Sequence, residues 1–95
     1  MNEVDEKNVS IFVAIITIEN KSFLNDPEGE TILNDLVLKG GYSDVKSVRT
    51  AKSLKIEVIA KDIDDAKVKV KNMCDDLRIY NPIVSECKII IKRNR

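Results

Sequence analysis

The chemically reactive side chains of this sequence are few, and they do not combine into a familiar catalytic site. The 95 residues include no histidine, which removes the usual general base near neutral pH, the commonest metal ligand and any Ser-His or Cys-His nucleophile. Cys74 and Cys87 lie thirteen positions apart, which is not a metal-site spacing and favours two small buried thiols. Whether they could form a disulfide depends on geometry that a sequence does not show. We therefore predict no catalytic, cofactor-binding or metal-ligating residue.

A strong helix-start pattern occurs at residues 26–30. Asp26 suits the N-cap, Pro27 suits the first helical position, where its missing N–H costs nothing, and Gly29 suits close packing. The free N–H groups of a helix start can bind phosphate. Here Asp26, Glu28 and Glu30 place three negative charges where a phosphate would approach. We therefore predict a structural role for Asp26, Pro27 and Gly29.

Arg49 and Lys52 are the candidate partner-contact residues. They flank a predicted hairpin turn, where basic side chains can pair with carboxylates or phosphates of another molecule. A solvated turn would carry the same residues, so the pattern alone leaves both interpretations open. The other charges are mixed in sign along the predicted helices, which is typical of a solvated surface.

Hydrophobic patterning predicts the elements that must position these residues. Alternating or β-branched runs indicate strands, and apolar residues at spacings of three and four indicate helices. The predicted elements are a strand over 9–18, a helix from Asp26 to near Lys39, strands over 45–50 and 54–60 joined by a turn at 51–53, a helix after Asp62, and a last strand over 83–92. Asn81 and Pro82 end the second helix, because proline cannot continue it.

The order of elements predicts an α+β fold. We expect a two-layer, ferredoxin-like βαββαβ sandwich with a four-stranded antiparallel sheet and two helices on one face. One domain would span residues 9–92, between a flexible acidic N-terminal extension at 1–8 and a basic C-terminal tail at 93–95. The first strand is apolar at both parities, and Ile59 and Ile90 are out of phase with their neighbours. The open sheet face therefore needs a cover, so we predict a homodimer or a dimer of dimers.

Composition excludes several classes of function. Sixteen basic residues balance sixteen acidic ones, and only two tyrosines and two phenylalanines are present, so no nucleic-acid or anionic membrane partner is expected. The polar N-terminus is unlike a signal peptide, and no apolar run reaches transmembrane length. The residues themselves predict a cytoplasmic, non-catalytic interaction module.

An ordered set of short motifs resembles one known family. The motifs are Asn25-Asp26-Pro27-Glu28-Gly29, Gly41-Tyr42, Val45-Lys46-Ser47-Val48-Arg49 with Lys52, and Met73-Cys74 followed by Asn81-Pro82-Ile83-Val84. In this order, from about Val9 to Lys92, they resemble the PurS subunit of phosphoribosylformylglycinamidine (FGAM) synthase. No single motif is specific, and the ordered set carries the resemblance.

The resemblance implies a non-catalytic subunit of a glutamine- and ATP-dependent ligase in de novo purine biosynthesis. Members of the family form dimers, possess no cofactor of their own and join two larger proteins. A PurQ-type glutaminase releases ammonia, and a PurL-type synthetase consumes it with ATP and Mg. The small subunit would bridge the two and support ammonia transfer. By resemblance, Arg49 and Lys52 would meet a partner subunit, and Asn81 and Pro82 would form the turn before the last strand.

Two departures from the family pattern and one rival function accompany this resemblance. Ala51 stands where the family commonly has glycine, and the stretch 27–42 is about one residue longer, which Gly40 beside Gly41 could absorb at the helix end. The rival is a regulatory domain that binds a small molecule between two copies. An acylphosphatase-like enzyme would need a Gly-rich, Arg-bearing loop after the first strand, which this sequence lacks.

Overall fold

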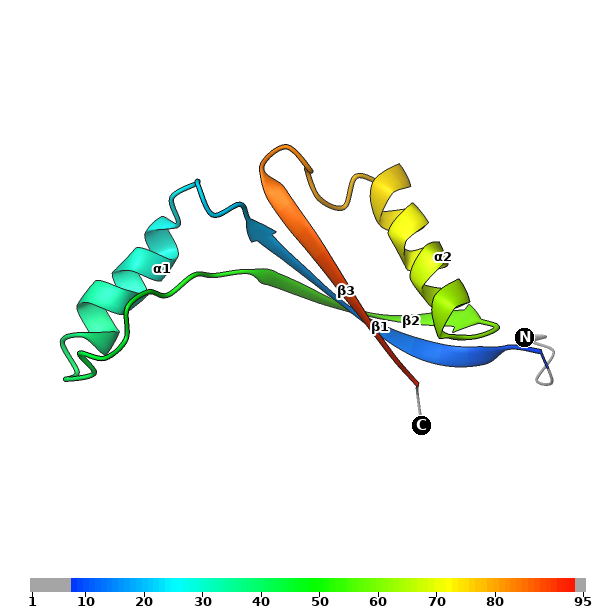
Figure 1. Ribbon diagram of the computed structural model, residues 1–95, viewed down its shortest axis with the longest axis horizontal. Helices are drawn as coiled ribbons and strands as arrows, with labels where there is room; N and C mark the ends of the chain where they lie inside the picture. Colours follow the sequence, from blue (N-terminus) through cyan, green and yellow to red (C-terminus); the bar gives the residue numbers. More distant parts are fainter. Residues whose placement is uncertain (1–7, 94–95) are drawn as a thin grey trace.

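The structure is a computed structural model that describes residues 8–93, so residues 1–7 of the predicted acidic extension and 94–95 of the predicted basic tail lie outside the described residues. The elements are β1 (Ser10–Asn20), α1 (Pro27–Thr31), η1 (Ile32–Val37), β2 (Lys52–Ala60), α2 (Ile63–Asp76) and β3 (Ser85–Arg93). The strands form an antiparallel sheet in the order β2-β1-β3, and α2 lies across one face of it (Figure 1). No helix within residues 8–93 is long and apolar enough to cross a membrane.

The central strand β1 alternates between two apolar faces of the sheet. Phe12, Ala14 and Ile16 are fully buried on the face that α2 covers, and Ile16 lies opposite Leu54 on β2 and Ile89 on β3. Successive side chains of a strand point to opposite faces, so the residues between these three face away from α2. The hydrophobic core is therefore a single layer between α2 and the sheet.

The face of the sheet away from α2 is open and partly apolar. Ile11 lies opposite Ile59, and both are 44% exposed; Ile90, opposite Ile15, is 57% exposed. The prediction that the out-of-phase isoleucines lie on an uncovered face is confirmed. No element of residues 8–93 covers this face.

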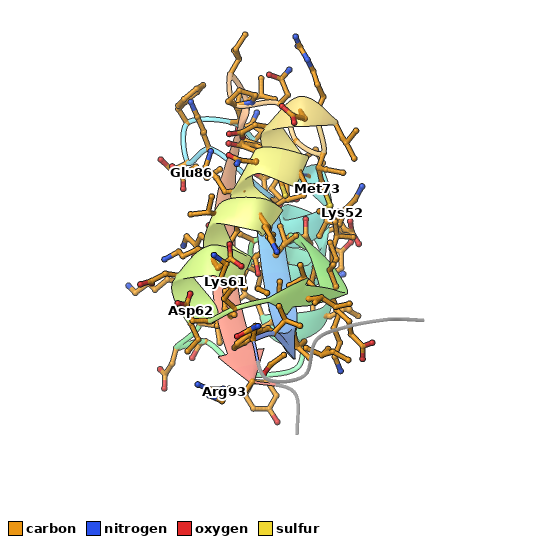
Figure 2. All side chains as sticks on the ribbon, turned by 90° about the vertical axis from the view of Figure 1, so that its right-hand side faces the viewer. Lys52, Lys61, Asp62, Met73, Glu86 and Arg93 are labelled. Carbon is orange, nitrogen blue, oxygen red and sulfur yellow. The ribbon has the colours of Figure 1, made fainter. Side chains whose placement is uncertain are left out.

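Helix α2 begins and packs as its sequence predicts. Asp62 is its N-cap residue and accepts a hydrogen bond from the N–H of Asp65 at 2.8 Å. Ala66, Val70 and Cys74, at four-residue spacing, are buried against the sheet. Figure 2 views the molecule with α2 in front of the strands, Asp62 near the lower end of the helix and Met73 near its upper end.

The predicted fourth strand, residues 45–50, is wrong, and so is the hairpin turn at 51–53. Residues 45–51 form no strand, and Lys52 and Ser53 already belong to β2. The register explains the difference. Because Ile18 pairs with Lys52 and β1 ends at Asn20, the chain before Lys52 runs past the end of the sheet and finds no strand to pair with. The described sheet has three strands rather than four.

The prediction that both helices cover one face of the sheet is also wrong, because only α2 does. The α1 and η1 helices belong to an arm, residues 21–51, that projects beyond the sheet (Figure 1). The molecule measures 55 × 30 × 20 Å with a radius of gyration of 17.9 Å, whereas a compact domain of this length would have about 12 Å. The arm accounts for this elongation.

The first helix ends earlier than predicted and is wider in its second half. Its η1 part is a π-helix that ends at Val37, and the N–H of Leu38 donates to the carbonyl of Leu33, five residues back, at 2.9 Å. The N–H of Tyr42 repeats this spacing to Val37 at 3.2 Å. A π-helical turn holds one more residue than an α-helical turn. The widening offers a place for the extra residue that we predicted near Gly40.

Candidate partner-binding site

The predicted partner-contact residues lie at one end of the sheet, which we call the arm end. They are Arg49, Lys52, Asn81 and Pro82. Two contacts bring them to this end: Ile18 near the end of β1 pairs with Lys52, and the N–H of Lys21 donates to the carbonyl of Val84 at 2.9 Å. The segments before β2 and before β3 therefore flank the same end of β1.

Asp26 joins the start of α1 to the segment that leads into β2. Its buried carboxylate accepts hydrogen bonds from the N–H of Gly29 at 3.1 Å, from the N–H of Thr50 and from the Thr50 hydroxyl at 3.0 Å. The Thr50 and Gly29 N–H groups are the main reasons that the pKa of Asp26 lies below its ordinary value, and the Arg49 charge adds a smaller effect. The sequence indicates the cap but not the contact with Thr50, which is 24 residues away.

Gly29 lets α1 lie directly against the same segment. A Cβ at this position would be 2.2 Å from the carbonyl oxygen of Val48, closer than real Cβ atoms come to any neighbour. Pro27, the first residue of α1, begins the helix without leaving an N–H unpaired. The three residues for which we predicted a structural role thus lie where the arm folds back toward β2.

Arg49 is exposed, yet its guanidinium is already engaged within the chain. It donates to the carbonyl of Leu24 at 2.8 Å and to those of Asn20 and Lys21, each at 3.2 Å. These three carbonyls belong to the end of β1 and the loop that follows it. Arg49 therefore holds the base of the arm in place, and its contact with a partner stays a prediction.

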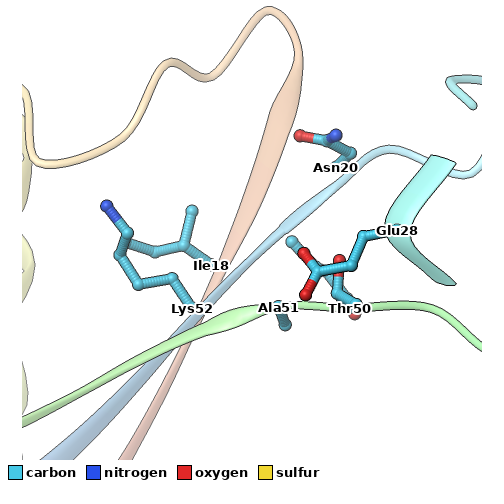
Figure 3. Close-up of a pocket in the computed structure, with 7 residues that line it drawn as sticks. Ile18, Asn20, Glu28, Thr50, Ala51 and Lys52 are labelled. Carbon is cyan, nitrogen blue, oxygen red and sulfur yellow. The ribbon is translucent and has the colours of Figure 1, made fainter. Parts of the chain in front are cut away.

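Lys52 borders a groove of about 570 Å³ between the arm and the sheet. The groove is lined by Ile18, Glu19, Asn20, Glu28, Thr50, Ala51 and Lys52. Figure 3 shows Lys52 directed away from Glu28, which approaches from α1 on the other side. Within residues 8–93 the Lys52 ammonium forms no hydrogen bond or ion pair. The groove thus offers a cation, carboxylates and an amide to polar groups of another molecule.

Asn81 and Pro82 form the turn before β3. The Asn81 side-chain oxygen accepts from the N–H of Ile83 at 3.0 Å, and its backbone carbonyl accepts from the N–H groups of Val84 and Ser85 at 3.1 and 2.8 Å. This is the local side-chain turn that asparagine favours. Pro82 is exposed and borders a second depression, of about 460 Å³, with Asp75, Arg78 and Tyr80.

The sequence interpretation missed the apolar surface of the arm. Leu36 lies on the first helix, which we expected to cover the sheet, but its side chain is 66% exposed. Phe23 and Tyr42 are 73% and 69% exposed on the same arm. Helical spacing identifies apolar residues on one side of a helix without showing whether anything covers them.

No group of three His, Cys, Asp or Glu side chains within residues 8–93 could hold a metal ion.

Comparison with known proteins identifies the family. Residues 13–93 match the family model described as PurS: Phosphoribosylformylglycinamidine (FGAM) synthase. A PurS subunit of this synthase from Archaeoglobus fulgidus is 35% identical over 78 residues, which cover 82% of this chain and 95% of that relative. The crystal structure of the Thermotoga maritima purS subunit aligns with a TM-score of 0.77 at 34% identity, covering 87% of this chain and 93% of that chain.

A second solved structure agrees. Thermus thermophilus PurS aligns with a TM-score of 0.75 at 27% identity and covers 90% of this chain and 99% of that chain. Both alignments cover most of this chain and nearly all of the matched chain, so the similarity extends over most of the fold. Since the family model spans most of the sequence and these relatives agree with it, the chain belongs to the PurS family of FGAM synthase subunits.

Proposed function

We propose that this chain is the non-catalytic small subunit of FGAM synthase, where it bridges the glutaminase and synthetase subunits and supports the passage of ammonia between them. The whole enzyme is a ligase of de novo purine biosynthesis. It converts formylglycinamide ribonucleotide, glutamine and ATP to the amidine, ADP, phosphate and glutamate. ATP and Mg would be bound by the synthetase, and the assembly would work in the cytoplasm.

The arm is the observation that best supports this proposal. It extends past the sheet and presents Phe23, Leu36 and Tyr42, each at least 66% exposed. Large apolar and aromatic side chains gathered on one projecting element are typical of protein interfaces. A projecting apolar arm suits attachment to a larger assembly, and it offers no arrangement of nucleophile and base for catalysis.

The open face of the sheet supports self-association as part of the same function. Its isoleucines, Ile11, Ile59 and Ile90, lie between charged neighbours such as Lys92, which is opposite Val13 on β1. A symmetric contact between two copies would cover this face without a further protein. Sedimentation of the isolated chain tests this, and a strictly monomeric species at micromolar concentration would contradict it.

The bridging role predicts a difference between two nitrogen sources. The synthetase and glutaminase of the same organism should form the amidine from glutamine only when this chain is present. With a high concentration of ammonium salt, amidine formation should depend on the chain far less, because no transfer between subunits is then needed. If neither reaction responds to the chain and the three proteins do not co-elute with nucleotide and glutamine, the proposal is wrong.

Lys52 provides the sharper test of the site. Lys52→Ala removes a cation that has no partner within the described residues, so the fold should be unchanged while assembly with the larger subunits weakens. Lys67→Ala, on the exposed surface of α2 away from the arm, is the matched control. Equal co-elution of the two variants with the synthetase would remove Lys52 from the site.

A further inference from the structure

The two cysteines of the chain meet in the core at the contact between α2 and β3. Cys74 is the last residue of the buried stripe on α2 and is 0% exposed. Cys87 lies on β3 opposite Ile18, on the face that α2 covers, and packs against the same cluster as Cys74. The sequence alone could not show that two residues thirteen positions apart would pack into one core cluster from two different elements.

The second thiol lies in the same core cluster as Cys74. Burial is the main reason that the pKa of the Cys74 thiol lies above its ordinary value, and Cys87 contributes to the same upward shift. Both thiols are free in this structure. Because they are the chain's two cysteines, an intramolecular disulfide has one possible connectivity.

We propose that Cys74 and Cys87 form a redox pair that a peroxide oxidises to a disulfide joining α2 to β3. Cys87 is half-buried, whereas Cys74 is inaccessible, so the peroxide reaches Cys87 first. The Cys87 thiolate attacks one peroxide oxygen, the O–O bond breaks, and a sulfenic acid and water form. The Cys74 sulfur then loses its proton and attacks the Cys87 sulfur, which forms the S–S bond and releases a second water. Two thiols lose two electrons, and the peroxide accepts them.

The disulfide would close a loop that shapes the arm end of the sheet. Residues 74–87 include the left-handed Arg78, with φ 54°, and the turn formed by Asn81 and Pro82. They also include Val84, whose carbonyl accepts from the N–H of Lys21 at the base of the arm. Oxidation would therefore restrain one border of the arm end. The inference rests on the core contact and does not depend on the proposed function.

Hydrogen peroxide applied to the reduced, folded full-length chain tests the proposal. We expect the intact mass to fall by two hydrogens, a linked Cys74–Cys87 peptide to form, and dithiothreitol to restore both thiols. Since both thiols belong to one core cluster, the linked product should exceed sulfinic acid by at least about tenfold. Cys87→Ala and Cys74→Ala each keep one thiol, so neither variant should form an internal disulfide. Because Cys74 is buried, Cys74→Ala could disturb folding, and Cys87→Ala is the control that leaves Cys74 unchanged. Two thiols that survive the treatment, or a Cys87 sulfinic acid without linked peptide, would overturn the proposal.

Discussion

Gly29→Ala should detach the arm from the segment that leads into β2. The new Cβ would lie 2.2 Å from the Val48 carbonyl oxygen and 2.9 Å from a carboxylate oxygen of Asp26. Ordinary contact starts near 3.4 Å, so α1 and Val48 must separate by about 1 Å. That movement would lengthen the hydrogen bonds from Asp26 to Thr50, which join the same two segments.

The size of the effect follows from two opposing contributions. Alanine favours a helix over glycine by about 1 kcal/mol, and overpacking costs about 1–3 kcal/mol. The obstacle here is a backbone carbonyl, which cannot rotate away as a side chain can, so the cost belongs at the upper end of this range. The net loss is about 2 kcal/mol, which corresponds to about a 30-fold increase in the population of the detached arm.

Amide hydrogen exchange measures this opening residue by residue. The Thr50 N–H donates to Asp26, so its exchange should accelerate about 30-fold in the Gly29→Ala variant, while the amides of β1 and α2 keep their protection. Thr31→Ala is the matched control, because it improves helix propensity on the exposed side of α1 without a clash. If Gly29→Ala protected Thr50 as well as Thr31→Ala does, the close contact with Val48 would be refuted.

Three further perturbations probe the arm base and the core. The pKa of Asp26 lies below its ordinary value of 3.8, so its stabilising effect is complete above that value and is lost as pH falls through the lower folded pKa. The protection of the Thr50 amide, taken relative to its intrinsic exchange rate at each pH, should therefore fall below about pH 4, and an Asp26→Asn variant that kept this loss of protection would contradict the assignment. Arg49→Ala should free three carbonyls and raise amide exchange over residues 20–24. Arg49→Lys should restore only part of the lost protection, because an ammonium lacks the planar fork of donors. Full restoration of protection by lysine would argue that the three Arg49 hydrogen bonds do not hold the base of the arm. Ile16→Ala should lower the free energy of unfolding in urea by about 2–5 kcal/mol, since Ile16 is 0% exposed, and a loss below about 1 kcal/mol would exclude it from the core.

The sheet and α2 could be predicted because their signals are local. Each strand of the sheet alternates or is β-branched, and the stripe of α2 fixes its buried face by spacing alone. The segment 45–50 fails for a non-local reason: its apolar residues suggest a strand, but pairing requires a neighbour, and β1 ends at Asn20. The hydrophobic pattern of one segment carries no information about the residue at which the neighbouring strand ends.

The candidate site also contains some interactions that the sequence predicts and others that it does not. The N-cap role of Asp26 and the turn at Asn81 depend on residues within three positions, so the sequence indicates both. The interactions of Arg49 depend on carbonyls 25 to 29 residues away. Every residue has a backbone carbonyl, so nothing in the sequence marks the three that Arg49 selects. Arg49 was predicted to contact a partner; it is exposed, and its guanidinium donates to the backbone of its own chain.

The arm also changes how the chain's topology should be understood. β1 and β2 are antiparallel neighbours, so they form a β-hairpin whose connection has grown into residues 21–51. The fully buried hydrophobic side chains of residues 8–93 lie in β1, β2 and α2, and the connection contributes none of them. Replacing it by a tight turn would reduce the entropy cost of closing the hairpin by about 2 kcal/mol. The long connection therefore adds an entropy cost without adding a fully buried hydrophobic side chain, which agrees with the proposed role of the arm in binding a partner.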